Sequence, residues 1–424
     1  MYKISEDKNG VRLICKKIPG VSSVSLGIWI NTGSRNEDIS INGVSHFLEH
    51  LVFKGSKKYT SDQIKEYIEG VGGTLNAFTS EENTCYYAKF LKKHFAKILD
   101  VLSEMTLRPL LRSKDIEKER TVIIEEIKMY KDLPRFHVQE LFDTLFWPDH
   151  SLGRNIAGSI ESVSGIARER IKSYHEKWYS SAQIVISCAG DIDEGVVGDS
   201  VKNVFSKLKY SQALSYTPFK AKGEAIRIRV INKPIEQTHL NLGFPALNRS
   251  DKDRFVLGLM HVILGGNMSS RLFNEIREKK GLAYEIASHV KKLKDCGVFF
   301  VHAGIDNKNL ISASRVIFEQ LDKIRSKKVL NGELRRAKDF YTAQAEMALD
   351  DTMEHMLWMG ESIMNLGYLQ TKEEMRRMIE RVTAGDILRL ARDIIRFDRL
   401  CFAAVGPQSA RSEGEIKKIA GSYQ

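Results

Sequence analysis

NGVSHFLEHLVFKGS, residues 42–56, follows VSSVSLGIWINTGS, residues 21–34, and this pair decides the fold class. The earlier stretch is an apolar, β-branched run typical of a buried strand, and the later one has the spacing of a helix that Gly55 ends. The second half of the chain repeats the order, with a strand expected at 238–247 and an apolar helix at 253–266. This repetition indicates an internal duplication.

The remaining segments extend the duplication. Thr60 and Gln63 have the spacing of a capping box at the start of the next helix of the first half. We expect helices, strands and further helices in the same order in both halves, at 60–73, 72–80, 83–91, 92–107 and 113–130, and at 269–281, 282–290, 297–305, 312–324 and 331–349. The sequence therefore predicts an α+β fold with two homologous domains, each a mainly antiparallel sheet packed with helices.

The two domains should meet near the middle of the chain. Residues 208–224, LKYSQALSYTPFKAKGE, contain Ser, Pro, Gly and Lys without clear periodicity, which is typical of a linker. A chain of 424 residues also exceeds the usual size of one hydrophobic core. We predict domains at 1–212 and 213–424.

Composition excludes several classes of protein. Hydrophobic residues make up 42% and charged residues 28%, and no apolar run has membrane-spanning length. The net charge of +11 comes from Lys and Arg interleaved with Glu and Asp, which predicts a solvated surface and no nucleic-acid partner. The charged amino terminus lacks the features of a signal peptide, and the five scattered cysteines form no C-x-x-C pair. A reducing cytoplasm and no membrane association are expected.

HFLEH, residues 46–50, is the motif that carries chemistry. His46 and His50 lie one helical turn apart and can both reach one ion, and neutral imidazoles suit zinc. Glu49 lies at the edge of the same face, where it could take a proton from a water molecule as general base. The alternative is a pair of ordinary helix histidines, since chance produces the pattern on the order of once in fifty such chains.

A third ligand is needed, and residues 113–130 offer several carboxylates. Glu119 and Glu126 are seven residues apart and share one helix face, with Val122 and Ile123 beside it to bury that face. A carboxylate on a partly buried face requires a cation or hydrogen-bond donors. A surface helix with ordinary acids is the alternative.

HFLEH followed by ERTVIIEEIKMY resembles the pitrilysin/insulinase family of zinc peptidases, whose inverted motif is H-x-x-E-H. Within that family the chain is most similar to the β-type chains of the mitochondrial processing peptidases and their bacterial homologues. Supporting stretches run through most of the chain: GGTLNAFTSEENTCYY, LGRNIAG, GGNMSSRLFNEIREKKGLAYEI and the late VGP.

The resemblance implies roles for individual residues. Glu126, which lies 126 − 50 = 76 residues after His50, matches the family's third ligand of a single Zn²⁺ ion per chain. Glu119 matches an acidic residue that supports the site from behind the ligands. Asn76 and Ala77 match a strand edge along which an extended peptide binds as an added strand.

The second half lacks these groups. His46 and Glu49 correspond to Leu257 and Met260, and Glu126 to about Gln344. The resemblance implies that this metal-free domain closes over the substrate.

Many family members place an Arg and a Tyr in this domain to hold the substrate, but this chain has Phe299 where the Arg would fall. Arg277 and Tyr284 are nearby polar residues that could replace the pair, and the sequence leaves this open.

The sequence therefore predicts a zinc-dependent endopeptidase that hydrolyses extended, unstructured peptides inside a closed chamber. The alternative is a catalytically silent scaffolding or binding subunit of the same family. Because family members that act alone join four such domains in one chain, we expect a dimer, either of two identical chains or with a metal-free paralogue.

Overall fold

The computed structural model describes residues 2–220, 225–409 and 411–423, so residues 221–224 of the predicted linker lie outside the described residues. The chain forms two compact units. Unit one consists of residues 1–128, 154–217 and 347–369, and unit two of residues 129–153, 218–346 and 370–424. The units part close to the expected linker, between Thr217 and Pro218, but unlike the expected 1–212 and 213–424 each also includes a segment from the other half of the sequence.

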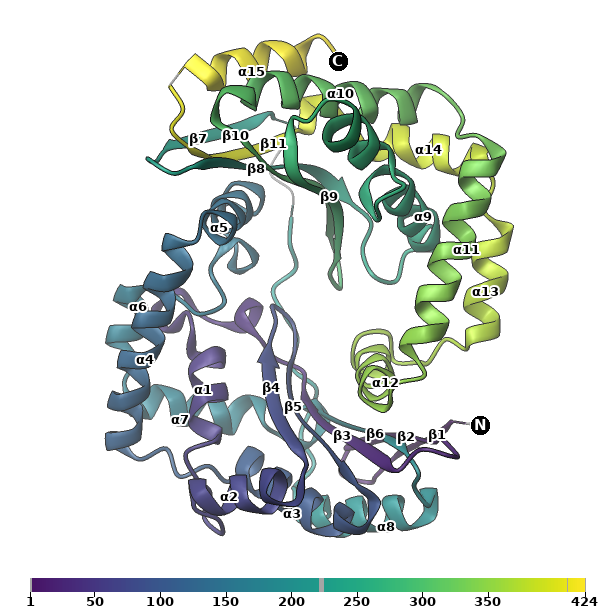
Figure 1. Cartoon of the computed structure of the whole chain (residues 1–424). Coiled ribbons are helices and arrows are strands. Elements are labelled where there is room, and N and C mark those ends of the chain that lie inside the picture. Colours follow the sequence, from purple (N-terminus) through teal and green to yellow (C-terminus); the bar gives the residue numbers. More distant parts are fainter. Residues whose placement is uncertain (1, 221–224, 410, 424) are drawn as a thin grey trace. The chain divides into compact units, whose positions relative to one another are not determined.

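Unit one is a mixed sheet with helices on both faces (Figure 1). Its strand order is β1-β2-β6-β3-β5-β4, in which only β2 and β6 are parallel neighbours. The strands are β1 Lys3–Glu6, β2 Arg12–Lys17, β3 Ser23–Ile30, β4 Thr74–Thr79, β5 Thr84–Leu91 and β6 Ile184–Gly190. The α-helices are α1 Val44–Val52, α2 Ser61–Ile68, α3 Phe95–Leu107, α4 Ser113–Asp132, α6 Ile160–Gly165, α7 Arg168–Trp178, α8 Glu194–Phe205 and α12 Thr352–Leu366.

Unit two has the same design. Its strand order is β7-β11-β8-β10-β9, and β7 and β11 are its parallel pair. The strands are β7 Arg227–Asn232, β8 Gln237–Ala246, β9 Ala283–Lys292, β10 Gly297–Asp306 and β11 Cys401–Gly406. The helices are α5 Pro134–Phe146, α9 Arg254–Gly265, the π-helix η7 Phe273–Lys279, α10 Leu310–Ser326, α11 Asn331–Ala348, α13 Lys372–Arg381, α14 Ala384–Ile394 and α15 Arg411–Gly421.

The two sheets confirm the duplicated α+β fold. Strand by strand, β2-β6-β3-β5-β4 of unit one matches β7-β11-β8-β10-β9 of unit two, including the position of the parallel pair. The predicted capping box is also confirmed, because Thr60 and Gln63 exchange hydrogen bonds at the start of α2. The expectation of mainly antiparallel sheets holds, with one parallel pair in each.

Strand side chains alternate between two apolar layers. In β11, Phe402 and Ala404 join the larger core beneath α9, α10 and α14, while Cys401, Ala403 and Val405 face the other way. That second face is covered by α5, a helix from the first half of the sequence (Figure 1). Both faces of the unit two sheet are therefore buried, and the second layer depends on a helix from the other half.

Unit one shows the reciprocal arrangement. Helix α12, from the second half of the sequence, packs on β2, β3 and β6 of unit one (Figure 1). Met356 and Met359 of α12 and Trp29 of β3 are buried together in this layer. Gly27 and Gly360 allow the close approach, since a Cβ on Gly360 would lie 2.0 Å from Trp29 Nε1. The two halves have exchanged one helix each.

Among the described residues, no helix combines the length and the apolar character needed to cross a bilayer.

Candidate metal centre

The start of helix α1 is held by a buried carboxylate. Glu37 accepts hydrogen bonds from the backbone N–H groups of Gly43 and Ser45, at 2.7 and 2.8 Å, and from Asn42 Nδ2 at 2.9 Å. Gly43 has a φ of 97°, and a Cβ there would lie 2.5 Å from the carbonyl oxygen of Ala157. Because a carboxylate is favourable at a helix N-terminus, Glu37 fixes where α1 begins and how its side chains are aimed.

Helix α1 buries one face and turns its polar residues to the other. Phe47, Leu48 and Leu51 lie in the core of unit one, while His46 and His50 come from the opposite side with ring centroids 4.7 Å apart. The side chains of these two histidines keep 13% and 22% of their surface exposed. The imidazoles are thus anchored by a buried helix but remain accessible.

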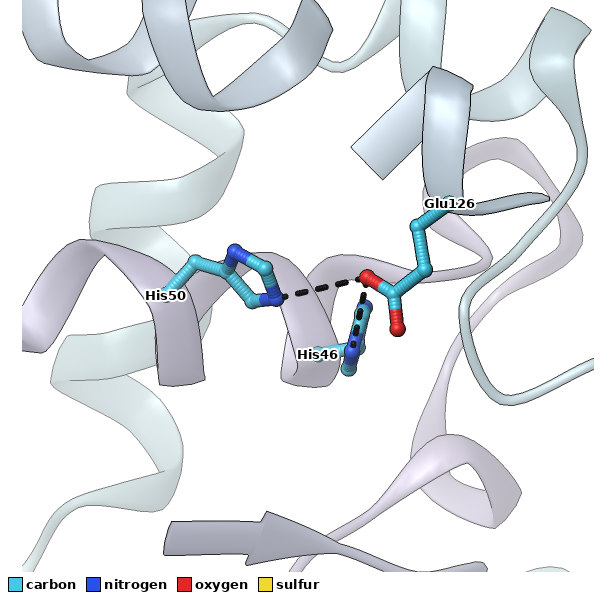
Figure 2. Close-up of side chains that lie close together, drawn as sticks. All are labelled: His46, His50 and Glu126. Atoms are coloured by element: carbon cyan, nitrogen blue, oxygen red, sulfur yellow. Dashed lines mark ion pairs between the residues drawn. The ribbon is translucent and has the colours of Figure 1, made fainter. Parts of the chain in front are cut away.

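Helix α4 brings a carboxylate to both imidazoles (Figure 2). Glu126 Oε2 lies 3.8 Å from His46 Nε2 and 3.6 Å from His50 Nε2. Ile123 is buried as expected, but Val122 is 44% exposed and does not bury this face. The packing of α4 instead comes from residues spaced by helical turns: Ile116, Glu119, Ile123 and Ile127.

The three side chains fit a zinc ion. Their ligand atoms lie within 4.8 Å of one another, and within the described ranges this is the one such group of His, Cys, Asp or Glu. Tetrahedral ligands at zinc bond lengths are separated by about 3.3–3.5 Å, close to the 3.8 and 3.6 Å between Glu126 Oε2 and the two imidazoles. The Glu126 distances are too long for hydrogen bonds, so a cation between the three groups accounts for their approach better than direct contact.

Burial favours the ligating form of His46. Desolvation, with a smaller contribution from the nearby His50, lowers the pKa of His46 to about 4. His46 is therefore neutral at neutral pH, and a metal ion would not have to displace a proton from it.

Glu119 orients the second imidazole. Its Oε2 lies 3.1 Å from His50 Nδ1, and its Oε1 lies 2.7 Å from Lys54 Nζ. A carboxylate is an acceptor only, so in this contact His50 Nδ1 donates its proton to Glu119. His50 Nε2 is then left with the lone pair that a metal requires.

Glu49 is held apart from the three ligands. Thr79 Oγ1, at the end of β4, donates a hydrogen bond of 2.6 Å to Glu49 Oε2. Burial raises the pKa of Glu49, while the bond from Thr79 acts in the opposite direction. A carboxyl group whose pKa is raised toward neutrality is suited to accept and release a proton near neutral pH.

Strand β4 carries the two residues predicted to bind substrate. Asn76 and Ala77 pair with Tyr87 and Tyr86 of β5, and the other side of β4 is the edge of the sheet. Asn76 is exposed, and its own Oδ1 accepts a 2.8 Å hydrogen bond from Ala77 N. Because Thr79 ends the same strand, the free edge runs up to the contact with Glu49.

The structure brings together His46, His50 and Glu126, with Glu119 and Glu49 in contact with the group or beside it. Sequence reasoning missed Lys54 and Thr79. Lys54 lies in the turn just after α1, and its nearness to the motif along the chain was the available signal. Thr79 is brought to Glu49 by sheet packing, which local spacing does not reveal.

The residues left open in the second half lie in unit two. Phe299 is fully buried in its core, so it has a packing role. The guanidinium of Arg277 lies over the rings of Phe273 and Tyr284, at 4.7 and 5.5 Å, and Tyr284 is 75% exposed. Arg277 and Tyr284 therefore form a surface cation–π pair.

Comparison with known families gives the class of protein. Residues 12–159 match the model described as Insulinase (Peptidase family M16), and residues 165–341 match the Peptidase M16 inactive domain. An uncharacterized zinc protease of Streptomyces coelicolor is 35% identical over 94% of this chain and 88% of its own length. The uncharacterized zinc protease YmxG of Bacillus subtilis is 34% identical over 94% and 97%. The chain belongs to the M16, or insulinase, family of metallopeptidases.

Solved structures share the fold. A protease from Helicobacter pylori superposes with a TM-score of 0.90 at 22% identity and covers 96% of this chain and 99% of that one. A structure from Pseudomonas fluorescens, titled as a peptidase M16 inactive domain, gives a TM-score of 0.88 at 18% identity, with 96% and 99% coverage. At these identities the likeness concerns the fold alone.

Proposed function

We propose that this chain is an active zinc endopeptidase that hydrolyses extended, unstructured peptides through the inverted motif His46-x-x-Glu49-His50. The observation that carries the proposal is the meeting of two imidazoles and the Glu126 carboxylate, with a second, separately held carboxylate beside them. Three protein ligands and one free general base are the set that a catalytic zinc site requires.

One zinc ion per chain would be held by His46 Nε2, His50 Nε2 and Glu126 Oε2. When bound, zinc supplies a Lewis acid that polarises a peptide carbonyl and lowers the pKa of a water molecule. Glu119 would keep His50 in the tautomer that ligates, and Lys54 forms an ion pair with Glu119.

Glu49 is the general base of the proposed reaction. It takes a proton from the attacking water, and the new C–O bond forms at the scissile carbonyl carbon. Glu49 then delivers the proton to the leaving nitrogen as the C–N bond breaks. The Thr79 hydrogen bond holds Oε2 of Glu49, so Oε1 remains for the proton transfer.

The substrate would bind as an added strand along the free edge of β4, at Asn76 and Ala77. Pairing of this kind uses backbone groups that every peptide has, so it tolerates many sequences. It also requires an extended segment, which favours unstructured peptides over folded proteins.

Because the chain has two units where family members that act alone join four such domains, we propose that it acts as a dimer, most simply with two-fold symmetry. A dimer with a metal-free paralogue is the second candidate, and the burial of Phe299 where many relatives place an arginine favours considering it. Light scattering separates the two: an active chain of twice the monomer mass supports the homodimer, and activity restored only by a second protein supports the paralogue.

The decisive experiment is digestion of a peptide library with mass-spectrometric mapping of the cuts. Wild type should cleave unstructured peptides and lose activity with a chelator. Glu49→Gln should retain zinc by elemental analysis yet cleave slower by a factor on the order of 10² to 10⁴, because it removes the base but no ligand. A zinc-loaded wild type that leaves every peptide intact, alone and in its dimer, would instead identify a silent binding subunit.

A further inference from the structure

Unit two carries a second group of chemistry-bearing side chains, on the face of its sheet toward α5. Gly304 of β10 lies opposite His239 of β8 on one side and Glu285 of β9 on the other. His302 precedes Gly304 by two residues, so it projects from the same face of β10. Because Gly304 has no side chain, two imidazoles and a carboxylate from three adjacent strands lie around its position on this face.

The hydrogen bonds of His302 settle its tautomer. Asn241 Nδ2 donates to Gln139 Oε1 at 2.8 Å, which leaves Asn241 Oδ1 to face His302 Nδ1 at 2.7 Å. An amide oxygen accepts hydrogen bonds, so His302 Nδ1 carries the proton. His302 Nε2 therefore presents a bare lone pair.

That lone pair is costly where it lies. His302 is 3% exposed, and its Nε2 is buried without a hydrogen-bond partner among the described residues. A buried polar atom is normally satisfied, and an unsatisfied one calls for an explanation. An imidazole whose Nδ1–H is bound to a carbonyl oxygen and whose Nε2 is free has the arrangement of a metal-ligating histidine.

His239 supplies a second nitrogen. Its ring stacks on that of His302 with centroids 5.6 Å apart and an angle of 30° between the planes. Within the described part of the chain, His239 Nδ1 is likewise buried with no hydrogen-bond partner. The ring occupies the space over Gly304, since a Cβ there would lie 3.3 Å from His239 Cε1.

The carboxylate near the two rings, Glu285, is paired with an arginine of α5. Arg135 Nη1 of α5 lies 2.7 Å from Glu285 Oε1, and both side chains are partly exposed. His289 faces the same side, with its ring stacked on Phe300 at 5.0 Å. The partner of Glu285 is thus a solvent-exposed arginine, which Glu285 could exchange for another cation.

We propose that His302 and His239 bind a transition-metal ion of the zinc or copper class at a second site, with Glu285 able to leave Arg135 and complete the ligand set. Imidazole nitrogens suit these ions, and two histidines with one carboxylate is a known zinc combination. Histidines at diagonal positions of neighbouring antiparallel strands are within mutual reach. The site is separate from His46, His50 and Glu126 and does not depend on the proposed hydrolysis.

The test is equilibrium dialysis of the full chain against micromolar Zn²⁺, with bound metal counted by elemental analysis. His302→Ala and His239→Ala should each bind one zinc fewer than wild type, or bind it at least tenfold more weakly, whereas the control His94→Ala should match wild type. His302→Ala changes a buried residue and could impair folding, whereas His239 is only half buried, so His239→Ala is the less disruptive variant. Thermal melting checks that both variants are folded. Equal zinc binding in wild type and both variants overturns the proposal.

A variant that is expected to bind Zn²⁺ more tightly at the second site provides a sharper test. Arg135→Gln changes an exposed residue of α5, frees Glu285 and removes a positive charge from the site. Zn²⁺ should bind this variant several-fold more tightly at the second site, a result that loss of structure cannot produce. Unchanged affinity would overturn the part assigned to Glu285.

Discussion

Helices α1 and α9 hold equivalent places in the two units, but the positions that are polar in α1 are apolar in α9. In α1, His46 and Glu49 lie outside the apolar core, and α4 adds Glu126 opposite them. In α9 the corresponding Leu257 and Met260 are fully buried in the core of unit two. The duplication preserved strand order and helix placement, while one copy filled the equivalent face with packing side chains.

The second helix of each unit shows the same divergence. Glu119 of α4 corresponds by position to Ala337 of α11, which is buried, and Glu126 to Gln344, which is exposed. A polar cluster is stable only where its members satisfy one another. Because α9 has neither the histidine nor the base, a buried carboxylate at position 337 would have no such partner there. The comparison teaches that the members of such a site depend on one another.

The largest difference is expected between two alanine substitutions, one at the proposed ligand Glu126 of unit one and one at its counterpart Gln344 of unit two. Glu126→Ala should lose zinc and reduce peptide hydrolysis by a factor on the order of 10³ or more, because the remaining histidines bind the ion weakly. Gln344→Ala should change neither. Elemental analysis and a fluorogenic peptide assay decide, and stoichiometric zinc in Glu126→Ala would remove that residue from the ligand set.

A smaller effect is expected one step behind the ligands. Glu119→Gln keeps the shape but loses the charge that holds His50, so zinc affinity should fall by about 10- to 100-fold. Lys54→Met should cost less, because Glu119 would remain in place. Both are measured by competition with a chelating dye. If Lys54→Met lowered zinc affinity more than Glu119→Gln, the ammonium group of Lys54 would act on the metal site by a route other than Glu119.

The smallest effect is expected on the stability of the apolar layer in which α12 packs against the sheet of unit one. Gly360→Ala would place a methyl group against Trp29, and overpacking of this kind costs about 1–3 kcal/mol. Urea denaturation measures the loss in free energy of unfolding. Gly414→Ala is the control, since a Cβ there has no neighbour within 4 Å, and it should be neutral or stabilising. Equal stability of both variants would show that α12 can shift to relieve the contact.

The grouping of His46, His50 and Glu126 could be anticipated because part of its information is local, while their role as metal ligands stays a prediction. His46 and His50 are related by one helical turn, and the resemblance located Glu126 on a second helix. Thr79 and Lys54 could not be found from helical spacing, because Thr79 meets Glu49 through sheet packing and Lys54, in the turn after α1, meets Glu119 of α4. The duplicated fold was also predictable, since strand and helix periodicities recur in order.

The helix exchange could not be predicted from periodicity. Helices α5 and α12 each have an amphipathic pattern, and such a pattern states that one face is buried but not which sheet buries it. Strand register could not be predicted either, because alternation along one strand does not show how it aligns with its neighbour. The position of His239 beside Gly304 depends on how β8 and β10 align, and a shift of one residue would turn His239 to the opposite face.

The exchanged helices also constrain how the protein can be made. A ribosome that has released residues up to Thr217 has produced every strand of unit one but not α12, so the layer around Trp29 stays open to water until residue 366 emerges. Helix α5, finished long before, must wait for β11 at 401–406 to complete the sheet that it covers. Each half therefore contains its larger core but cannot cover the second face of its own sheet, and α12 and β11, within residues 352–406, complete these second layers.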